Sequence, residues 1–238
     1  MIQVNNLNKA FNNKPAVKDL SFKISAGEIF GLLGPNGAGK TTTIRILATI
    51  LQPDSGSAMI NGHDVQKNPL EVRRSIGVLT TDIGHYDRFS ASENLAFFGQ
   101  LYGLGKQQLK NRIEELANLL DMTDFLDKKA GQCSTGMRQK IALARSIIHD
   151  PPIFILDEPT TGLDVLASQT VLQFIEQARK QEKTIILSTH NMSTAQNLCQ
   201  RVLIMHEGQE IFSGTPDLAL RQTRQDLLED AFMQLIEN

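Results

Sequence analysis

Residues 34–41 read GPNGAGKT and fit the pattern G-x-x-x-x-G-K-[ST] at every fixed position. The apolar run EIFGLL comes directly before this segment, and the helical pattern TTTIRILATIL overlaps its end. A glycine-rich loop between a strand and a helix can turn its backbone N–H groups toward phosphate oxygens, and the helix dipole adds to that attraction. The alternative is a glycine-rich turn that contains a lysine by chance, but such a turn would not need to lie between a strand and a helix. The segment therefore predicts a phosphate-binding loop.

The loop and a later acidic pair predict a site for a nucleotide and a cation. The loop residues are Gly34, Pro35, Asn36, Gly37, Ala38, Gly39, Lys40, Thr41 and Thr42. Lys40 is expected to reach the β- and γ-phosphates, and Thr41 to ligate Mg²⁺. The apolar run IFILDE ends in Asp157 and Glu158, which repel each other at a dry strand end unless a cation or proton lies there. We expect Asp157 to hold Mg²⁺ and Glu158 to take a proton from the attacking water, rather than both acids merely capping a loop.

Strand-like and helical runs follow each other in an order that indicates the fold class. Strand-like runs open the chain at 2–7, 20–24 and 28–33, helical periodicity fills 91–149, and strand-like runs return in IFILDE, TIILSTH and RVLIMHEGQEIF. The tail from 216 to 238 reads as helix, with a stripe formed by Leu220, Leu227, Leu228, Phe232 and Leu235. Strands that alternate with helices predict a mainly parallel sheet.

The predicted fold is a single α/β domain over 1–238. Its P-loop NTPase (RecA-like) core spans about 1–82 and 150–238 and includes an N-terminal antiparallel β element. An α-helical subdomain is inserted at about 83–149. With 238 residues, of which 41% are hydrophobic, the chain can bury a substantial core.

Composition narrows the function classes. A net charge of −2 argues against a general nucleic-acid binder, although it leaves room for a local basic patch. No run approaches the roughly 20 apolar residues of a membrane span, and the N-terminus lacks a signal-peptide pattern. Cys133 and Cys199 have no metal-binding spacing, which indicates a reduced cytosolic compartment. If the chain works at a membrane, another chain must supply the channel.

The segment CSTGMRQK, residues 133–140, lies between the two motifs and begins a helix. It resembles the ABC signature, which usually reads LSGGQ followed by a basic residue. The matching residues are Ser134, Gly136, Arg138, Gln139 and Lys140, whereas Cys133, Thr135 and Met137 depart from the pattern. Taken alone, Ser134 also fits a plain helix N-cap. TGLD after the acidic pair resembles the D-loop of the same family, and ILSTH resembles its switch strand.

In this order, the motifs resemble the ABC family across almost the whole chain. The resemblance implies that two copies pack head to tail, so that each signature covers the ATP of the other copy. It implies nucleotide contacts by Phe11 on adenine, by His190 on the γ-phosphate, and from the second copy by Ser134, Thr135, Gly136 and Asp164. The alternatives from the residues alone are a core phenylalanine and a satisfied histidine at a strand end. ATP and Mg²⁺ are the expected cofactors.

One position departs from the family pattern. The family usually has a glutamine at the end of the strand that here reads IGVLTT, and Thr81 stands in its place, followed by Asp82. A carboxylate suits a hard cation better than an amide does, so Asp82 is a candidate metal ligand. The alternatives are a contact through an added water and an Asp82 that only caps the turn DIGHYD. Beyond it, Tyr86 and Phe89 are apolar groups that a permease helix could cover.

Three longer stretches resemble the sodium-extruding, NatA-type ABC exporter ATPases. They are VLTTDIGHYDRFSASENLAFFGQLYGL, STGMRQKIALARSIIHDPPIFILDEPTTGLDV and LEDAFMQLIEN. In that group the ATPase is a separate chain that pairs with a membrane permease. The resemblance implies an ATP-hydrolysing homodimer on the inner face of the cell membrane, with no nucleic-acid partner. Exporter ATPases for drugs and soluble ABC ATPases of nucleic acid or ribosomes are the alternatives, but the latter carry tandem ATPase pairs or coiled-coil or zinc insertions.

Overall fold

A six-stranded, mostly parallel sheet forms the centre of the computed structural model, which describes residues 2–80, 84 and 86–237. Its strands are β3 (Ile29–Leu33), β6 (Ile76–Leu79), β7 (Ile153–Asp157), β8 (Thr184–Thr189), β9 (Arg201–His206) and β10 (Gln209–Gly214), in the order β10-β9-β3-β8-β7-β6. Strands β9, β3, β8, β7 and β6 run parallel, and β10 pairs antiparallel with β9. The carboxyl ends of β3, β7 and β8 therefore meet at one edge, where the predicted motifs begin.

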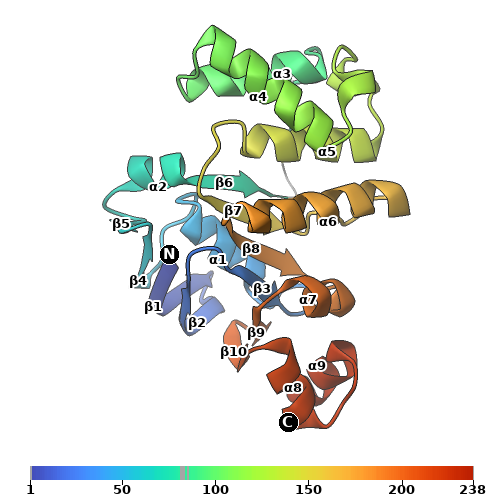
Figure 1. Cartoon of the computed structure of the whole chain (residues 1–238). Helices are drawn as coiled ribbons and strands as arrows, with labels where there is room; N and C mark the ends of the chain where they lie inside the picture. Colours follow the sequence, from blue (N-terminus) through green and yellow to red (C-terminus); the bar gives the residue numbers. More distant parts are fainter. Residues whose placement is uncertain (1, 81–83, 85, 238) are drawn as a thin grey trace.

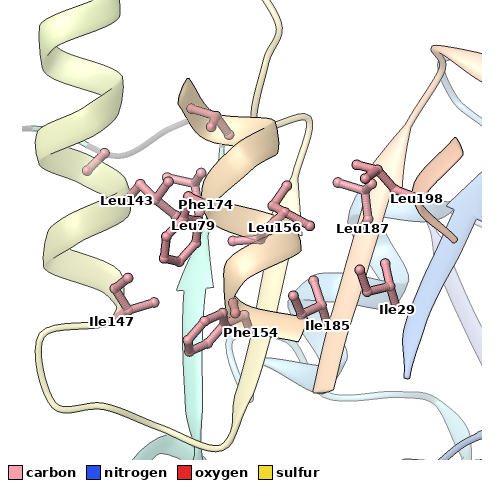
Figure 2. Packing of buried hydrophobic residues seen from close by; sticks show 14 of the residues in the cluster. Ile29, Leu79, Leu143, Ile147, Phe154, Leu156, Phe174, Ile185, Leu187 and Leu198 are labelled. Atoms are coloured by element: carbon pink, nitrogen blue, oxygen red, sulfur yellow. The ribbon is translucent and has the colours of Figure 1, made fainter. Parts of the chain in front are cut away.

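Both faces of this sheet are covered, which explains why inner strands such as β3 and β7 are buried along their whole length instead of alternating. In β7, Phe154 and Leu156 belong to one buried cluster, and Ile153 and Ile155 belong to another. Helices α5 (Thr135–Ser146) and α6 (Val165–Lys180) cover the first face, and α1 (Lys40–Leu47) covers the second. Figure 2 shows the first cluster, in which Leu143 and Phe174 lie near Leu79, Phe154 and Leu156.

A four-stranded antiparallel sheet confirms the N-terminal β element. It consists of β1 (Ile2–Phe11), β2 (Lys14–Ile24), β4 (Ser55–Ile60) and β5 (His63–Asp64), in the order β2-β1-β4-β5. Strands β1 and β2 are longer than the sequence pattern predicts because they meet in a tight turn at Asn12 and Asn13. These two residues have φ angles of 48° and 63°, as asparagine tolerates in hairpin turns. Helix α2 (Pro69–Ser75) then leads into β6.

Helices from the middle of the chain lie together at the top of Figure 1, on the opposite side of the central sheet from the antiparallel strands. They are α3 (Ala91–Leu101), α4 (Lys106–Leu119) and α5, with short 3-10 turns η1 (Thr123–Phe125) and η2 (Ala130–Gln132) between α4 and α5. A capping box of Ser90 and Glu93 begins α3. We propose that this group is the helical subdomain predicted at about 83–149, and those boundaries stay a prediction.

The tail differs from the single predicted helix. Helix α7 (Met192–Leu198) precedes β9, and the tail forms α8 (Pro216–Thr223) and α9 (Leu228–Glu237). Arg224 ends α8 with φ 56°, a left-handed conformation that breaks the helical period. Leu228 and Phe232 are therefore buried while Leu227 is 57% exposed, and the prediction that Leu227 shares their stripe is wrong.

Candidate functional site

The phosphate loop joins the end of β3 to the start of α1. Gly34 and Gly39 have φ angles of 150° and 104°. A Cβ atom at Gly34 would collide with the Met205 carbonyl oxygen, and one at Gly39 with the Ala16 carbonyl oxygen. Glycine is thus required at both positions by conformation and by space. Because α1 begins at Lys40, the free N–H groups of its first turn lie at the loop.

A cavity of about 350 Å³ lies over this loop. Its lining residues are Ala16, Asn36, Gly37, Ala38, Gly39, Lys40, Thr41, Thr42, Glu158, Thr161 and His190. The loop follows β3, Glu158 follows β7, and His190 follows β8, and these strands are neighbours in the sheet. The sheet order thus brings together side chains that are far apart in the sequence.

Lys40 is almost fully buried in the floor of this cavity. Its Nζ donates to the Gly34 and Pro35 carbonyl oxygens at 2.7 and 3.2 Å. Burial lowers the pKa of Lys40, and the nearby Glu158 and Asp157 carboxylates oppose that shift. A bound anion at the loop would stabilise the buried ammonium and favour its charged form.

Asp157 and Thr41 offer oxygen ligands beside the loop. Asp157 is 1% exposed, and its Oδ2 accepts a hydrogen bond from Thr41 Oγ1 at 3.0 Å. Its Oδ1 is buried and has no hydrogen-bond partner among the described residues. A hard cation such as Mg²⁺ fits this pair, because Mg²⁺ prefers a few protein oxygens together with waters and phosphate oxygens. The described residues contain no group of three or more His, Cys, Asp or Glu side chains suited to a metal, which is consistent with so small a protein ligand set.

Glu158 and His190 contact each other in the lining of this cavity. Glu158 has φ 51°, and its N–H donates to the Ser188 carbonyl oxygen at 3.0 Å. Its Oε1 lies 2.9 Å from His190 Nδ1, and its Oε2 accepts from Thr161 Oγ1 at 3.0 Å. The His190 side chain is 58% exposed, so this histidine is available to a ligand through its other ring nitrogen. Sequence reasoning missed the contact from Thr161, and only the spacing of three residues from Glu158 could have indicated it.

The predicted signature lies in a different cavity. Ser134 caps α5 by accepting from the Met137 N–H, and Asp164 caps α6 by accepting from the Ala167 N–H at 2.8 Å. Ser134, Gly136 and Asp164 line a cavity of about 590 Å³ whose lining contains no residue of the phosphate loop. A single chain therefore does not bring its own signature onto its own phosphate loop.

Other predicted site residues lie at the surface or outside the described part of the chain. Phe11 is 48% exposed, which excludes the core alternative, and Lys9 Nζ lies 5.7 Å from its ring centroid. Thr135 is exposed at the start of α5. Thr81 and Asp82 lie outside the described residues.

Comparison of the sequence with known proteins identifies the family. The model of the ABC transporter family matches residues 17–161. The ABC transporter ATP-binding protein NatA of Bacillus subtilis is 43% identical over 98% of this chain and 97% of its own length. The Nod factor export ATP-binding protein I of Burkholderia lata is 37% identical over 90% of this chain and 71% of that protein. The linearmycin resistance ATP-binding protein LnrL of B. subtilis is 35% identical, over 90% of this chain and 69% of its own length.

Solved structures confirm the predicted fold class. An ATP-binding subunit of an ABC transporter has a TM-score of 0.91 at 29% identity and covers 99% of both chains. A dimeric ATP-binding cassette in a post-hydrolysis state with ADP and Pi has a TM-score of 0.82 at 23% identity, covers 90% of this chain and 98% of its own, and supports the fold alone. Each helix among the described residues falls short of the length or the apolar character that a membrane span requires. The chain belongs to the ABC transporter family, in which it is an ATP-binding subunit and an ATPase.

Proposed function

We propose that hydrolysis in this subunit uses Glu158 as the general base and His190 as a contact of the γ-phosphate. The observation that carries the proposal is the placement of the Glu158 carboxylate, which lines the cavity with Lys40 and is held by His190 and Thr161. Water attacks the γ-phosphorus, the bond to the ADP oxygen breaks, and Glu158 takes the proton from the water. Asp164 and the signature residues act from the second copy.

The remaining side chains bind and orient the nucleotide. Lys40 exchanges the Gly34 and Pro35 carbonyl oxygens for phosphate oxygens, because its Nζ already lies at the loop. The exposed Phe11 ring stacks on adenine. Thr41 and Asp157 would hold Mg²⁺, with Asp82 as a third candidate, and the cation would supply positive charge against the phosphates.

A head-to-tail homodimer completes each site. The exposed N-terminus of α5, with Ser134, Thr135 and Gly136, offers N–H groups and a hydroxyl to an anion. Its separation from the phosphate loop of the same chain supports contact with the ATP of a second copy.

We propose that a membrane permease, as a separate chain, docks beside helices α3 and α5. A groove of about 300 Å³ there is lined by Ala48, Ile50, Arg73, Ile76, Val78, Phe98, Tyr102, Arg145 and Ser146. Next to it, the Tyr86 ring packs against Phe89, Phe97 and Phe98, with centroid distances of 5.2 to 6.2 Å. Tyr86 and Phe89 are 47% and 37% exposed. These aromatic side chains offer apolar area to a permease helix.

Export is the direction that the relatives support, and sodium is the substrate that the sequence resemblance favours. Relatives named for Nod factor export and for linearmycin resistance are 37% and 35% identical to this chain. Similar ATPase chains thus occur in proteins named for different compounds, which supports substrate selection by the permease. The subunit would then lie at the cytoplasmic face of the membrane.

Co-expression with the permease tests this assembly. The wild-type chain should sediment with membranes only when the permease is present. Tyr86→Ala with Phe89→Ala should reduce that association at least tenfold and leave basal ATP hydrolysis unchanged, since a tenfold loss needs only about 1.4 kcal/mol, which is within the apolar contact that two aromatic side chains provide. Leu227→Ala with Met233→Ala, which removes exposed apolar groups on the C-terminal segment, is the matched control. If both variants associate equally well with the permease, the aromatic surface is excluded as its docking site.

Transport by the assembled complex tests the substrate. Proteoliposomes that contain the complex should move ²²Na⁺ when ATP is present. If sodium is not transported but a drug or another small molecule is, the exporter function stands and sodium is excluded as the substrate.

A further inference from the structure

Two polar atoms at the carboxyl edge of the central sheet are buried and have no hydrogen-bond partner among the described residues. They are Asp157 Oδ1 and Ser188 Oγ. Asp157 is 1% exposed and Ser188 is 0% exposed. Strands β7 and β8 pair in parallel register with Asp157 opposite Ser188. Because neighbouring strands lie about 4.8 Å apart, one small polar molecule can contact both side chains.

The pleat directs both side chains to the face that α1 covers. Ile155 and Ile186 lie two residues earlier in β7 and β8, and both belong to the buried cluster that includes Ile44 of α1. Residues two apart in a strand share a face, so Asp157 and Ser188 share this one. The Thr41–Asp157 hydrogen bond joins the same face to α1. Ser188 is thus a neighbour of the proposed cation ligands.

A buried hydroxyl without a partner destabilises the folded chain. Two positions next to Ser188 hold apolar residues, Leu187 on the other face and Leu32 opposite Ser188 in β3. An apolar side chain at Ser188 would avoid the unfavourable burial. A hydroxyl at this position therefore points to a partner that binds with the ligand.

We propose that Ser188 is a positioning residue of the ATP site, whose hydroxyl gains its partner when the nucleotide and Mg²⁺ bind. The partner is one water that also contacts Asp157 Oδ1 and the cation, which gives it the number of polar contacts that a buried water needs. Thr41 holds Oδ2 of the carboxylate, and Ser188 holds Oδ1 through this water, so the carboxylate is fixed from both sides. The inference rests on the proposed function, because it requires a divalent cation at Thr41 and Asp157.

Ser188→Ala in the full chain should have two effects of opposite sign. In EDTA without nucleotide, the Tm should rise by about 2–4 °C, because removing an unpaired buried hydroxyl stabilises a chain of this size by such an amount. In saturating Mg²⁺, the affinity for the ATP analogue AMP-PNP should fall about fivefold or more. In EDTA, its affinity for the same analogue should equal that of the wild type.

Ser75→Ala is the matched control. Ser75 is also buried, but its hydroxyl donates to the Val72 carbonyl oxygen at 2.8 Å. This variant should lower the Tm and leave AMP-PNP affinity unchanged with and without Mg²⁺. A merely structural role of Ser188 would give the same pattern as Ser75.

The outcomes separate this inference from the proposed function. If the wild-type chain binds AMP-PNP equally well with and without Mg²⁺, the proposed cation site fails and the inference fails with it. If the wild type depends on Mg²⁺ and Ser188→Ala shows the same dependence, the inference alone is overturned. A Tm that falls for Ser188→Ala would show a partner in the ligand-free chain and would also overturn it.

Discussion

Replacing Glu158 by glutamine should remove the proton acceptor from the site while preserving its shape. The amide can still accept from His190 Nδ1 with its oxygen and donate to the Thr161 hydroxyl with its nitrogen, in place of the two contacts now made at 2.9 and 3.0 Å. Fold and cavity should therefore survive the change. The amide cannot take a proton from the attacking water.

The expected loss of hydrolysis is about 100- to 10,000-fold, the usual contribution of a general base, or roughly 3–5 kcal/mol of barrier. Nucleotide binding should stay equal or become tighter. The carboxylate that lines the cavity would no longer repel the γ-phosphate, and Lys40 would keep its place at the loop. Because bound ATP persists, the variant should accumulate as an ATP-bound dimer.

Two measurements test this reasoning. Phosphate release gives the turnover, and size-exclusion chromatography with ATP and Mg²⁺ gives the dimer fraction. Glu176→Gln is the control, because Glu176 is exposed on α6 and does not line the 350 Å³ cavity. Turnover of Glu158→Gln within a few-fold of the wild type, with ATP binding intact, would refute the assignment of the general base.

The remaining predictions concern the dimer and the pH dependence of folding. Gly136→Asp and Lys40→Ala should each abolish hydrolysis, and a mixture of the two variants should hydrolyse ATP faster than either variant alone. If cross-linking shows mixed dimers but the mixture is inactive, the signature does not act in trans. Burial lowers the pKa of His149 to about 4, so only the unfolded chain binds this proton between pH 6.5 and 4. The free energy of unfolding should therefore fall by up to roughly 3 kcal/mol as pH drops through this window. His149→Phe, which can keep the ring stacked on Tyr102, should remove that fall in urea titrations, and an unchanged pH dependence would contradict the reasoning.

Sequence alone could predict the parts of the site that local rules determine. The phosphate loop depends on glycines at fixed spacing between a strand and a helix, and Gly34 and Gly39 have the backbone that this pattern requires. The acidic pair is predictable from its position at the end of an apolar run. The N-caps at Ser134 and Asp164 also follow from local chemistry, although a capping role is predicted from the sequence for Ser134 alone.

The features that escaped prediction depend on register and on rare backbone conformations. Ser188 looks like an ordinary polar residue near a strand end until the pairing with β7 places it opposite Asp157. The break at Arg224 had no signal, because glycine or asparagine, not arginine, usually adopts the left-handed conformation after a helix. Neither the hydrophobic periodicity of the sequence nor its composition indicates the strand register or the left-handed conformation of Arg224.

Two buried charged groups of this subunit lie where Mg²⁺ and ATP would bind. Lys40 is a buried cation held by carbonyl oxygens, and Asp157 is a buried carboxylate with one oxygen that has no partner in the part of the chain that the structure describes. The two groups have opposite charge, so nucleotide phosphates would stabilise Lys40 but repel Asp157 unless a cation binds with them. Nucleotide and Mg²⁺ should therefore bind cooperatively, and by linkage each should raise the affinity for the other by the same factor. This coupling follows from placing both charges at one edge of the sheet, with the loop after β3 and Asp157 at the end of β7.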